Sequence, residues 1–503
     1  MATLDVVRRA GEALMQDVSR EYYLAYAGLK PGADLAAAYA RHPRAWDDDA
    51  LAAALEAWRG APASGDEALA ARALSEWLVE TRAARALAPL EEREIAWEHA
   101  AVVRLADGRV VPFHRVALEI ANAADRRERL ALDAARAELV AGELAALRQE
   151  RLQREQALVA EVGVADGYAA AFQALTGIDL HALGDECTRF LRDTQAMWED
   201  VGDDALRRRL GVPLGEATRA DATALLRAPQ FDDAFPAGAL EATVRTQVES
   251  MGVDPRAGGR VRYDTGEREG KRARAFCAPV RIPDEVYLVQ RPHGGQGDWR
   301  TFLHELGHAL HFAYTSPELR FEFRWLGDHS VTEGYAMLLD HLLHDRLWLR
   351  RYTELPAARV PEFLHAAAVE ELLFLRRYCG KLLYELQLHG GDLPWRALPD
   401  AYVTTMGEAT GLRHHAADAF VDVDPRFYVA RYLRAWQLQA VLTDALRERF
   451  DEDWFRNPAA GPWIVTELFG QGQREPADAL AVRVAGQSLG FAPLVRALEA
   501  QLS

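Results

Sequence analysis

The sequence predicts a mainly α-helical fold that contains one small β element. Apolar residues recur at helical spacing over most of the 503 residues, and the stretch 115–160 is rich in Ala, Leu, Glu and Arg. Such a composition is typical of long helices with one buried and one solvated face. Half of the residues are hydrophobic and 27% are charged, so the chain can bury a large core and is not expected to be disordered.

Helices are expected in the N-terminal half, with one interruption. They are predicted over about 4–90, 115–160, 165–210 and 238–251. Between the first two stretches, residues 101–113 contain two runs of β-forming residues around Asp107 and Gly108. An Asp-Gly pair between such runs is a strong signal of a β-hairpin.

The segment 255–295 differs from the rest of the chain. It contains many Gly and Pro residues and two strand-like runs, at 274–280 and 285–290. These features make it the most β-like part of the sequence, and helical periodicity resumes after it and continues to the end. A boundary between two regions is expected near 190–250.

The charge balance and the cysteine content exclude several classes of protein. Acidic residues outnumber basic ones by 76 to 59, and the net charge of −17 argues against a general nucleic-acid binder. Cys187, Cys277 and Cys379 form neither a disulfide framework nor a CxxC pair, which is typical of a reducing compartment. The N-terminus lacks the apolar core of a secretion signal, and no apolar run approaches about 18 residues. We therefore expect a cytoplasmic protein that does not bind membranes.

The segment most informative about chemistry is His304-Glu305-Leu306-Gly307-His308, an H-E-x-x-H motif. Residues four apart lie on the same face of a helix, so both imidazoles can point at one metal ion. Zinc binds such nitrogen ligands at about 2.0–2.1 Å, and Glu305 is placed to act as a general base. The alternative is a helix with two buried, hydrogen-bonded histidines and no metal.

The surroundings of the motif favour a helix. Asp298 is a suitable N-cap, and Pro317 follows the expected end. Gly307 costs a helix about 1 kcal/mol relative to Ala, which is tolerated where another backbone must approach closely. The apolar positions at helical spacing are Trp299, Phe302, Leu303, Leu306, Leu310 and Ala313.

A third ligand would strengthen the metal hypothesis. A histidine six residues after the second is one known pattern, but position 314 is Tyr, and His311 follows His308 by only three residues. Glu333 is the better candidate, since it lies on a second expected helix that a turn would bring back antiparallel to the first.

The role of Glu333 has an alternative. Ser330 and Glu333 have the spacing of a capping box, in which Glu333 contacts its own backbone and binds no metal. Asp328 is a second suitable N-cap, and a helix capped there would leave Glu333 able to bind a metal.

Three segments of the chain carry a family resemblance. They are REGKRARAFC (268–277), HELGHALH (304–311) and SVTEGYAML (330–338). Together they resemble the M3 family of zinc oligopeptidases, whose members include thimet oligopeptidase and oligoendopeptidase F. The resemblance implies a mainly helical, gluzincin-type fold with a deep substrate channel.

The resemblance also implies roles for individual residues. One Zn²⁺ ion would be bound by His304, His308 and Glu333, with Glu305 as the catalytic base. The family carries an acidic residue seven positions after the ligand Glu, and here that residue is Asp340. It would orient a ligand histidine by accepting a hydrogen bond from its ring.

The C-terminal segment DPRFYVARYLRAWQLQAVL (424–442) resembles the tyrosine-rich segment of the same family. The resemblance implies that a tyrosine donates a hydrogen bond to the oxyanion of the reaction; Tyr432 is the closer match, followed by Tyr428. Such a donor contributes about 3–4 kcal/mol of transition-state stabilisation. The match is incomplete, because Ala430 replaces a further tyrosine and His414 is out of register. The alternative is that both tyrosines pack on a core face.

The resemblance covers about 255–495 well and the N-terminal half loosely. We therefore predict a catalytic zinc-peptidase region at 191–503 and a mostly helical N-terminal region at 1–190.

The expected activity is zinc-dependent hydrolysis of internal bonds in short peptides. The alternatives are an HExxH metallocarboxypeptidase of the Taq type and a catalytically silent helical metal-binding protein. The sequence leaves the oligomeric state open.

Two neighbouring segments have both a structural and a functional interpretation. The strand at 285–290 is either purely structural or pairs along its edge with an extended peptide. The basic run at 268–274 is expected to be a solvated loop, with contact to a substrate carboxylate as the alternative. Cys277 is expected to be a small buried residue.

Overall fold

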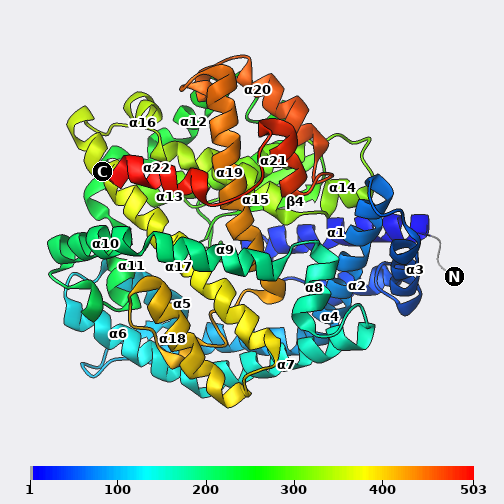
Figure 1. The fold of residues 1–503 in the computed structure, drawn as a ribbon, viewed down its shortest axis with the longest axis horizontal. Coiled ribbons are helices and arrows are strands. Elements are labelled where there is room, and N and C mark those ends of the chain that lie inside the picture. The colour runs from blue at the N-terminus through cyan, green and yellow to red at the C-terminus, as the bar shows by residue number, and fades with distance from the viewer. Residues whose placement is uncertain (1–3, 273, 503) are drawn as a thin grey trace. The chain divides into compact units, whose positions relative to one another are not determined.

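The computed structural model describes residues 4–272 and 274–502, which form a mainly helical fold with two small sheets (Figure 1). The predicted fold class is therefore confirmed. The chain divides into two compact units, each assembled from separate stretches. We call Met1–Val79, Pro229–Leu364 and Arg434–Leu494 the first unit, and Glu80–Ala228, His365–Leu433 and Val495–Ser503 the second unit. The predicted regions 1–190 and 191–503 divide the chain differently and stay a prediction.

The first unit holds the candidate metal ligands. Its helices are α1 (Leu4–Tyr26), α2 (Leu35–Arg41), α3 (Asp48–Gly60), α12 (Leu240–Ser250), α13 (Gln296–Tyr314), α14 (Phe321–Trp325), α15 (His329–Asp340), α16 (Arg346–Tyr352), α20 (Ala460–Trp463) and α21 (Ala477–Ala485). Its strands are β3 (Val261–Asp264), β4 (Phe276–Arg281) and β5 (Glu285–Val289).

The second unit consists mainly of helices and contains one hairpin. Its helices are α5 (Phe113–Asn122), α6 (Arg126–Leu139), α7 (Ala145–Val162), α8 (Tyr168–Thr176), α9 (Leu180–Asp193), α10 (Gln195–Leu210), α11 (Arg219–Arg227) and α18 (Leu398–Thr410), and its strands are β1 (Val102–Arg104) and β2 (Val110–Pro112). The helices that contribute residues to both units are α4 (Asp66–Ala100), α17 (Val360–Gly390), α19 (Tyr428–Phe450) and α22 (Ala492–Leu502).

The hairpin predicted at 101–113 is confirmed. Strands β1 and β2 pair antiparallel, with Val103 opposite Val111. The turn between them uses Gly108 at a φ of +89°, a conformation that glycine adopts at little cost. The Asp107 carboxylate accepts a hydrogen bond from the backbone N–H of Arg109, which stabilises the turn.

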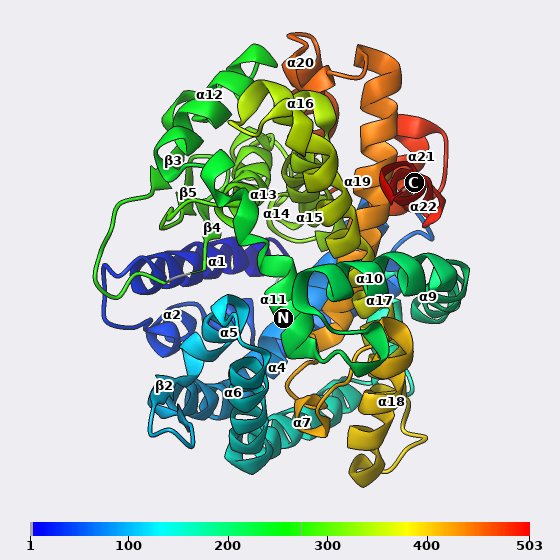
Figure 2. The ribbon, with the colours of Figure 1, turned by 90° about the vertical axis from the view of Figure 1, so that its left-hand side faces the viewer.

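A three-stranded sheet lies beside α13 in the first unit (Figure 2). Its strand order is β3-β5-β4, with β3 parallel and β4 antiparallel to β5. The runs predicted at 274–280 and 285–290 correspond to β4 and β5, whereas β3 is not among the predicted strands. Because β5 is paired on both sides, the interpretation in which a peptide adds to the edge of 285–290 is wrong.

The sheet packs on α13 through small apolar side chains. Val261 and Val286 of the sheet belong to one buried cluster with Ala309 and Ala313 of α13. The alanines let the helix lie close to the strands, and the cluster shields this side of the motif helix from water.

The apolar face predicted for α13 is confirmed, but its predicted N-cap is wrong. The residues Trp299, Phe302, Leu303, Leu306, Leu310 and Ala313 are at most 1% exposed. The helix begins at Gln296, with Gly295 in the N-cap position, so Asp298 lies in its first turn. The Asp298 carboxylate instead accepts hydrogen bonds from the backbone N–H groups of His293 and Gly294. It therefore holds the preceding loop against the helix.

None of the helices within 4–272 and 274–502 has the length and apolar character needed to traverse a lipid bilayer.

Candidate metal centre

Helices α13 and α15 lie in close contact at Gly307. A Cβ atom on this residue would lie 2.5 Å from the Cα of Ala336 and 2.7 Å from the carbonyl oxygen of Tyr335. Only glycine permits such an approach of two backbones. The contact accounts for a glycine inside the motif helix, and it holds Glu333, three residues before Ala336, close to that helix.

Replacing Gly307 with Ala should therefore destabilise the protein, although Ala normally favours a helix. The gain of about 1 kcal/mol in helix propensity is opposed by about 1–3 kcal/mol of overpacking. We expect the free energy of unfolding to fall by up to about 2 kcal/mol in urea denaturation. Gly297 is the matched control, because it also lies in α13 and a Cβ atom there would meet no packed neighbour within 4 Å. A Gly307→Ala protein as stable as Gly297→Ala would contradict the close contact.

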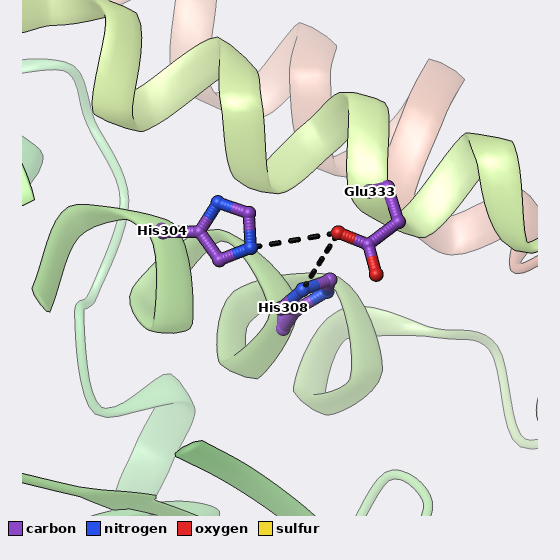
Figure 3. A group of neighbouring side chains, drawn as sticks. All are labelled: His304, His308 and Glu333. Atoms are coloured by element: carbon purple, nitrogen blue, oxygen red, sulfur yellow. Dashed lines mark ion pairs between the residues drawn. The ribbon is translucent and has the colours of Figure 1, made fainter. Parts of the chain in front are cut away.

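The two motif histidines and Glu333 converge (Figure 3). The Nε2 atom of His304 lies 3.5 Å from Oε2 of Glu333, and the Nε2 atom of His308 lies 3.6 Å from the same oxygen. One ligand atom from each of the three residues lies within 4.8 Å of the others. The structure thus brings together the three residues predicted as metal ligands.

The donor set and its spacing fit a zinc ion. Two imidazole nitrogens and one carboxylate oxygen are typical zinc ligands, with bonds of about 2.0–2.2 Å. A tetrahedral ion with such bonds holds its ligand atoms about 3.3 Å apart. The separations of the Glu333 oxygen from the two imidazole nitrogens, 3.5 and 3.6 Å, are close to this value.

The other ring nitrogen of each histidine is occupied by a neighbour on α15. Nδ1 of His304 lies 2.8 Å from Oδ2 of Asp340, and Nδ1 of His308 lies 2.9 Å from the hydroxyl of Thr332. These contacts hold the rings with Nε2 facing Glu333. The contact predicted for Asp340 is present, whereas Thr332 is not among the residues predicted from the sequence.

Helix α15 is capped by Asp328 and not by Ser330. Asp328 is the N-cap, and its carboxylate accepts a hydrogen bond from the backbone N–H of Ser330. Ser330 lies inside the helix, so the capping-box interpretation of Ser330 and Glu333 is wrong. Glu333 instead points toward the two histidines (Figure 3).

The charges in the cluster favour a positive charge on His304, which lies between the carboxylates of Glu333 and Asp340. Burial disfavours the charged form of His304, but hydrogen bonds to Asp340 and Glu333 outweigh burial and raise the pKa of His304 to about 10. Burial likewise opposes the charge of Glu333, yet His304 and His308 hold the pKa of that carboxyl well below its usual range. For Asp340, His341 and His304 overcome burial and lower the pKa in the same way. Both carboxylates are therefore ionised at neutral pH.

Glu305 lies outside the group of converging ligand atoms. Its side chain is partly exposed, and its charge adds to burial in raising the pKa of the Cys277 thiol on β4. Glu305 thus lies toward the strand that flanks α13. Cys277 is partly buried and packs against the cluster of Ala309 and Ala313.

The two tyrosines lie on α19, in the part that belongs to the second unit. The ring centroids of Tyr428 and Tyr432 are 5.1 Å apart, and the ring of Tyr432 lies 5.5 Å from that of Tyr378. Both side chains are partly exposed, whereas Val429 and Leu433 beside them are fully buried. The oxyanion role of Tyr432 and Tyr428 stays a prediction.

The basic run at 268–274 is only partly a solvated loop. Lys271 is buried, and its ammonium group donates to the backbone carbonyl and the carboxylate of Asp264 at 2.6 and 2.9 Å. Arg268 also donates to the Asp264 carboxylate, at 3.0 Å. These two residues fasten the loop that follows β3, whereas Arg272 and Arg274 are exposed as expected.

Comparisons with known proteins establish the fold. No protein-family model and no curated protein matches the chain. Among solved structures, an M32 carboxypeptidase from Deinococcus radiodurans R1 is similar with a TM-score of 0.63 and 14% identity, covering 99% of this chain and 97% of the other. A presumed peptidase from Chlamydophila abortus is similar with a TM-score of 0.64 and 14% identity, covering 99% and 88%. The chain shares its fold with these two proteins, and the resemblance to the M3 family is not confirmed.

Proposed function

We propose that this protein is a zinc-dependent peptidase that hydrolyses short peptides. The observation that carries the proposal is the convergence of His304, His308 and Glu333 on one point between α13 and α15. The H-E-x-x-H motif and the likeness of the fold to an M32 carboxypeptidase support it.

In this mechanism each named side chain has one task. Zinc bound by the three ligands would polarise the scissile carbonyl and lower the pKa of water. Glu305 accepts the proton of the attacking water and passes it to the leaving amine. Asp340 keeps the His304 ring in place through its hydrogen bond at 2.8 Å. Tyr432, or Tyr428 in its place, donates a hydrogen bond to the oxyanion.

The test is cleavage of an internally quenched fluorescent peptide. We expect fluorescence to rise with time, to stop on addition of 1,10-phenanthroline, and to recover when Zn²⁺ is restored. A metal-binding protein without catalytic function would bind zinc but leave the peptide intact. The absence of any cleavage across a varied peptide library would refute the proposed activity.

The position of the cleaved bond has two candidates. The resemblance of the motifs to M3 oligopeptidases favours internal bonds, and the likeness of the fold to an M32 carboxypeptidase favours removal of C-terminal residues. Mass spectrometry of the products separates the two, since single amino acids released from the C-terminus indicate a carboxypeptidase. Two peptide fragments from one internal cut indicate an oligoendopeptidase.

Zinc binding should release a proton from His304. The metal-free protein holds this proton because the pKa of His304 is raised to about 10, and the ring must lose it to bind an ion. Zinc affinity should therefore rise about tenfold per pH unit up to about pH 10, and weaken as the pH falls. Titration calorimetry in buffers of different ionisation enthalpy measures the release. An Asp340→Asn variant, which removes a cause of the raised pKa of His304, should release fewer protons when it binds zinc. A zinc affinity of the parent that does not change with pH would contradict this account.

Tyr432 should act on the rate of the reaction and not on zinc binding. Its hydroxyl, but not its ring, is removed in Tyr432→Phe. We expect kcat to fall by about 10²–10³, as for the loss of one oxyanion donor, with unchanged zinc content. Tyr428→Phe is the matched comparison on the same helix, and the larger loss identifies the donor. If neither variant changes kcat, the tyrosines only pack.

A further inference from the structure

Thr332 on α15 and His311 on α13 form a hydrogen-bonded arm that contacts His308 of the metal centre. The hydroxyl oxygen of Thr332 lies 2.9 Å from Nδ1 of His308 and 3.1 Å from Nδ1 of His311. Thr332 is buried, with 4% of its surface exposed. Its single hydroxyl group therefore bridges two histidines that lie three residues apart on α13.

His311 is enclosed among aromatic rings. Its side chain is fully buried, and its ring lies 4.9 Å from that of Tyr335 and 6.0 Å from that of Phe469. Burial, followed by the charge of His308, lowers the pKa of His311 to about 3. The ring is thus neutral at physiological pH, and a neutral imidazole carries a proton on only one of its two nitrogens.

The positions of the protons follow from counting donors and acceptors. A His308 ring that binds an ion through Nε2 carries its proton on Nδ1, so Nδ1 donates to the oxygen of Thr332. The one hydroxyl proton of Thr332 can then be donated to Nδ1 of His311. In this arrangement Nδ1 of His311 accepts that proton, which places the proton of His311 itself on Nε2.

We propose that Thr332 and His311 are positioning residues, which fix His308 in the tautomer and orientation required to bind zinc. This inference rests on the proposed function, because it needs a metal at His308. It assigns His311, the third histidine of the motif segment, to the support of a ligand. The arm runs from His308 through Thr332 to His311, and each hydrogen bond in it has one defined direction.

The two ligand histidines are therefore held by different chemistry. His304 is held by the ionised carboxylate of Asp340, whereas His308 is held by a neutral hydroxyl and a neutral imidazole. Glu333 and Asp340 already supply two buried negative charges. A neutral second arm orients His308 without adding a third charge to a buried site, where each unpaired charge is costly.

Zinc affinity tests this arm through a pair of variants. Thr332→Val keeps the size of the side chain and removes the hydroxyl, whereas Thr332→Ser keeps the hydroxyl and removes the methyl group. In competition with a chromophoric chelator, Thr332→Val should bind Zn²⁺ about 10–100-fold more weakly than the parent, and Thr332→Ser should stay close to the parent. Equal affinity of Thr332→Val and the parent would overturn the proposal. Equal impairment of both variants would also overturn it, because packing would then explain the loss.

The tautomer of His311 provides a second readout that needs no change in the bridging residue. In zinc-loaded protein labelled with ¹⁵N-histidine, the ¹⁵N shifts should show His311 protonated at Nε2 and bare at Nδ1. His311→Asn identifies the His311 signal by its loss. The amide oxygen of Asn at this position should also accept a hydrogen bond from Thr332, so this variant should retain more zinc affinity than His311→Leu. A His311 ring protonated at Nδ1 would overturn the proposal. A parent protein that binds no Zn²⁺ would refute the proposed function itself, and the inference with it.

Discussion

Glu305→Gln should keep its zinc and lose almost all turnover. The amide has nearly the shape of the carboxylate but cannot accept a proton from water, so the general-base contribution disappears. We expect kcat to fall by about 10²–10⁴ while the zinc content stays at the level of the parent. Glu305 is not among the three converging ligands, which is why the substitution should affect turnover without affecting zinc content.

The matched control for this variant is Glu318→Gln. Glu318 is exposed just beyond the end of α13, so the substitution removes the same charge without touching the centre. Peptide hydrolysis, measured by the fluorescence assay together with zinc analysis, should be normal in Glu318→Gln. If Glu305→Gln cleaves peptides as fast as the parent, another group is the base.

Glu333→Ala should remove the metal and, with it, the activity. Its carboxylate oxygen Oε2 lies 3.5 Å from Nε2 of His304 and 3.6 Å from Nε2 of His308. Loss of a residue that supports a ligand costs about 10–100-fold in metal affinity, so loss of a ligand should cost more than about 100-fold. Dialysed Glu333→Ala should contain well below one zinc per chain, and excess Zn²⁺ should restore little activity.

Glu318→Ala is the control for general effects of removing a glutamate. A comparison of melting temperatures in the absence of metal shows whether the fold of Glu333→Ala is kept. Full zinc occupancy in a folded Glu333→Ala protein would mean that Glu333 is not a ligand. The third ligand would then have to come from another part of the chain.

The local features of the site are predictable from the sequence because they depend on nearby residues. The buried face of α13 follows from the spacing of Trp299 through Ala313, and the two-histidine face follows from a spacing of four. Glu333 could be proposed as the third metal ligand because a second helix that returns antiparallel to the motif helix is a simple arrangement. The choice between Asp328 and Ser330 as N-cap needed the structure, since both have suitable side chains.

Features that depend on distant partners could not be predicted from the sequence. Strand β3 has only four residues and gains its pairing from β5, which follows about 20 residues later. The bridge made by Thr332 arises only because Gly307 lets α15 approach α13, so no local pattern marks it. Lys271 is a different case, because its partner Asp264 is close in the sequence and only the composition of 268–274 indicated a solvated loop. The two units also combine stretches that are far apart in the chain.

The central claim is that one zinc ion is bound by His304, His308 and Glu333. Diffraction data collected on both sides of the zinc absorption edge, from crystals of the zinc-loaded protein, test it most directly. We expect one anomalous peak at about 2.0–2.2 Å from Nε2 of His304, Nε2 of His308 and a carboxylate oxygen of Glu333. Anomalous density that lies elsewhere in the molecule, with none between α13 and α15, would contradict the claim.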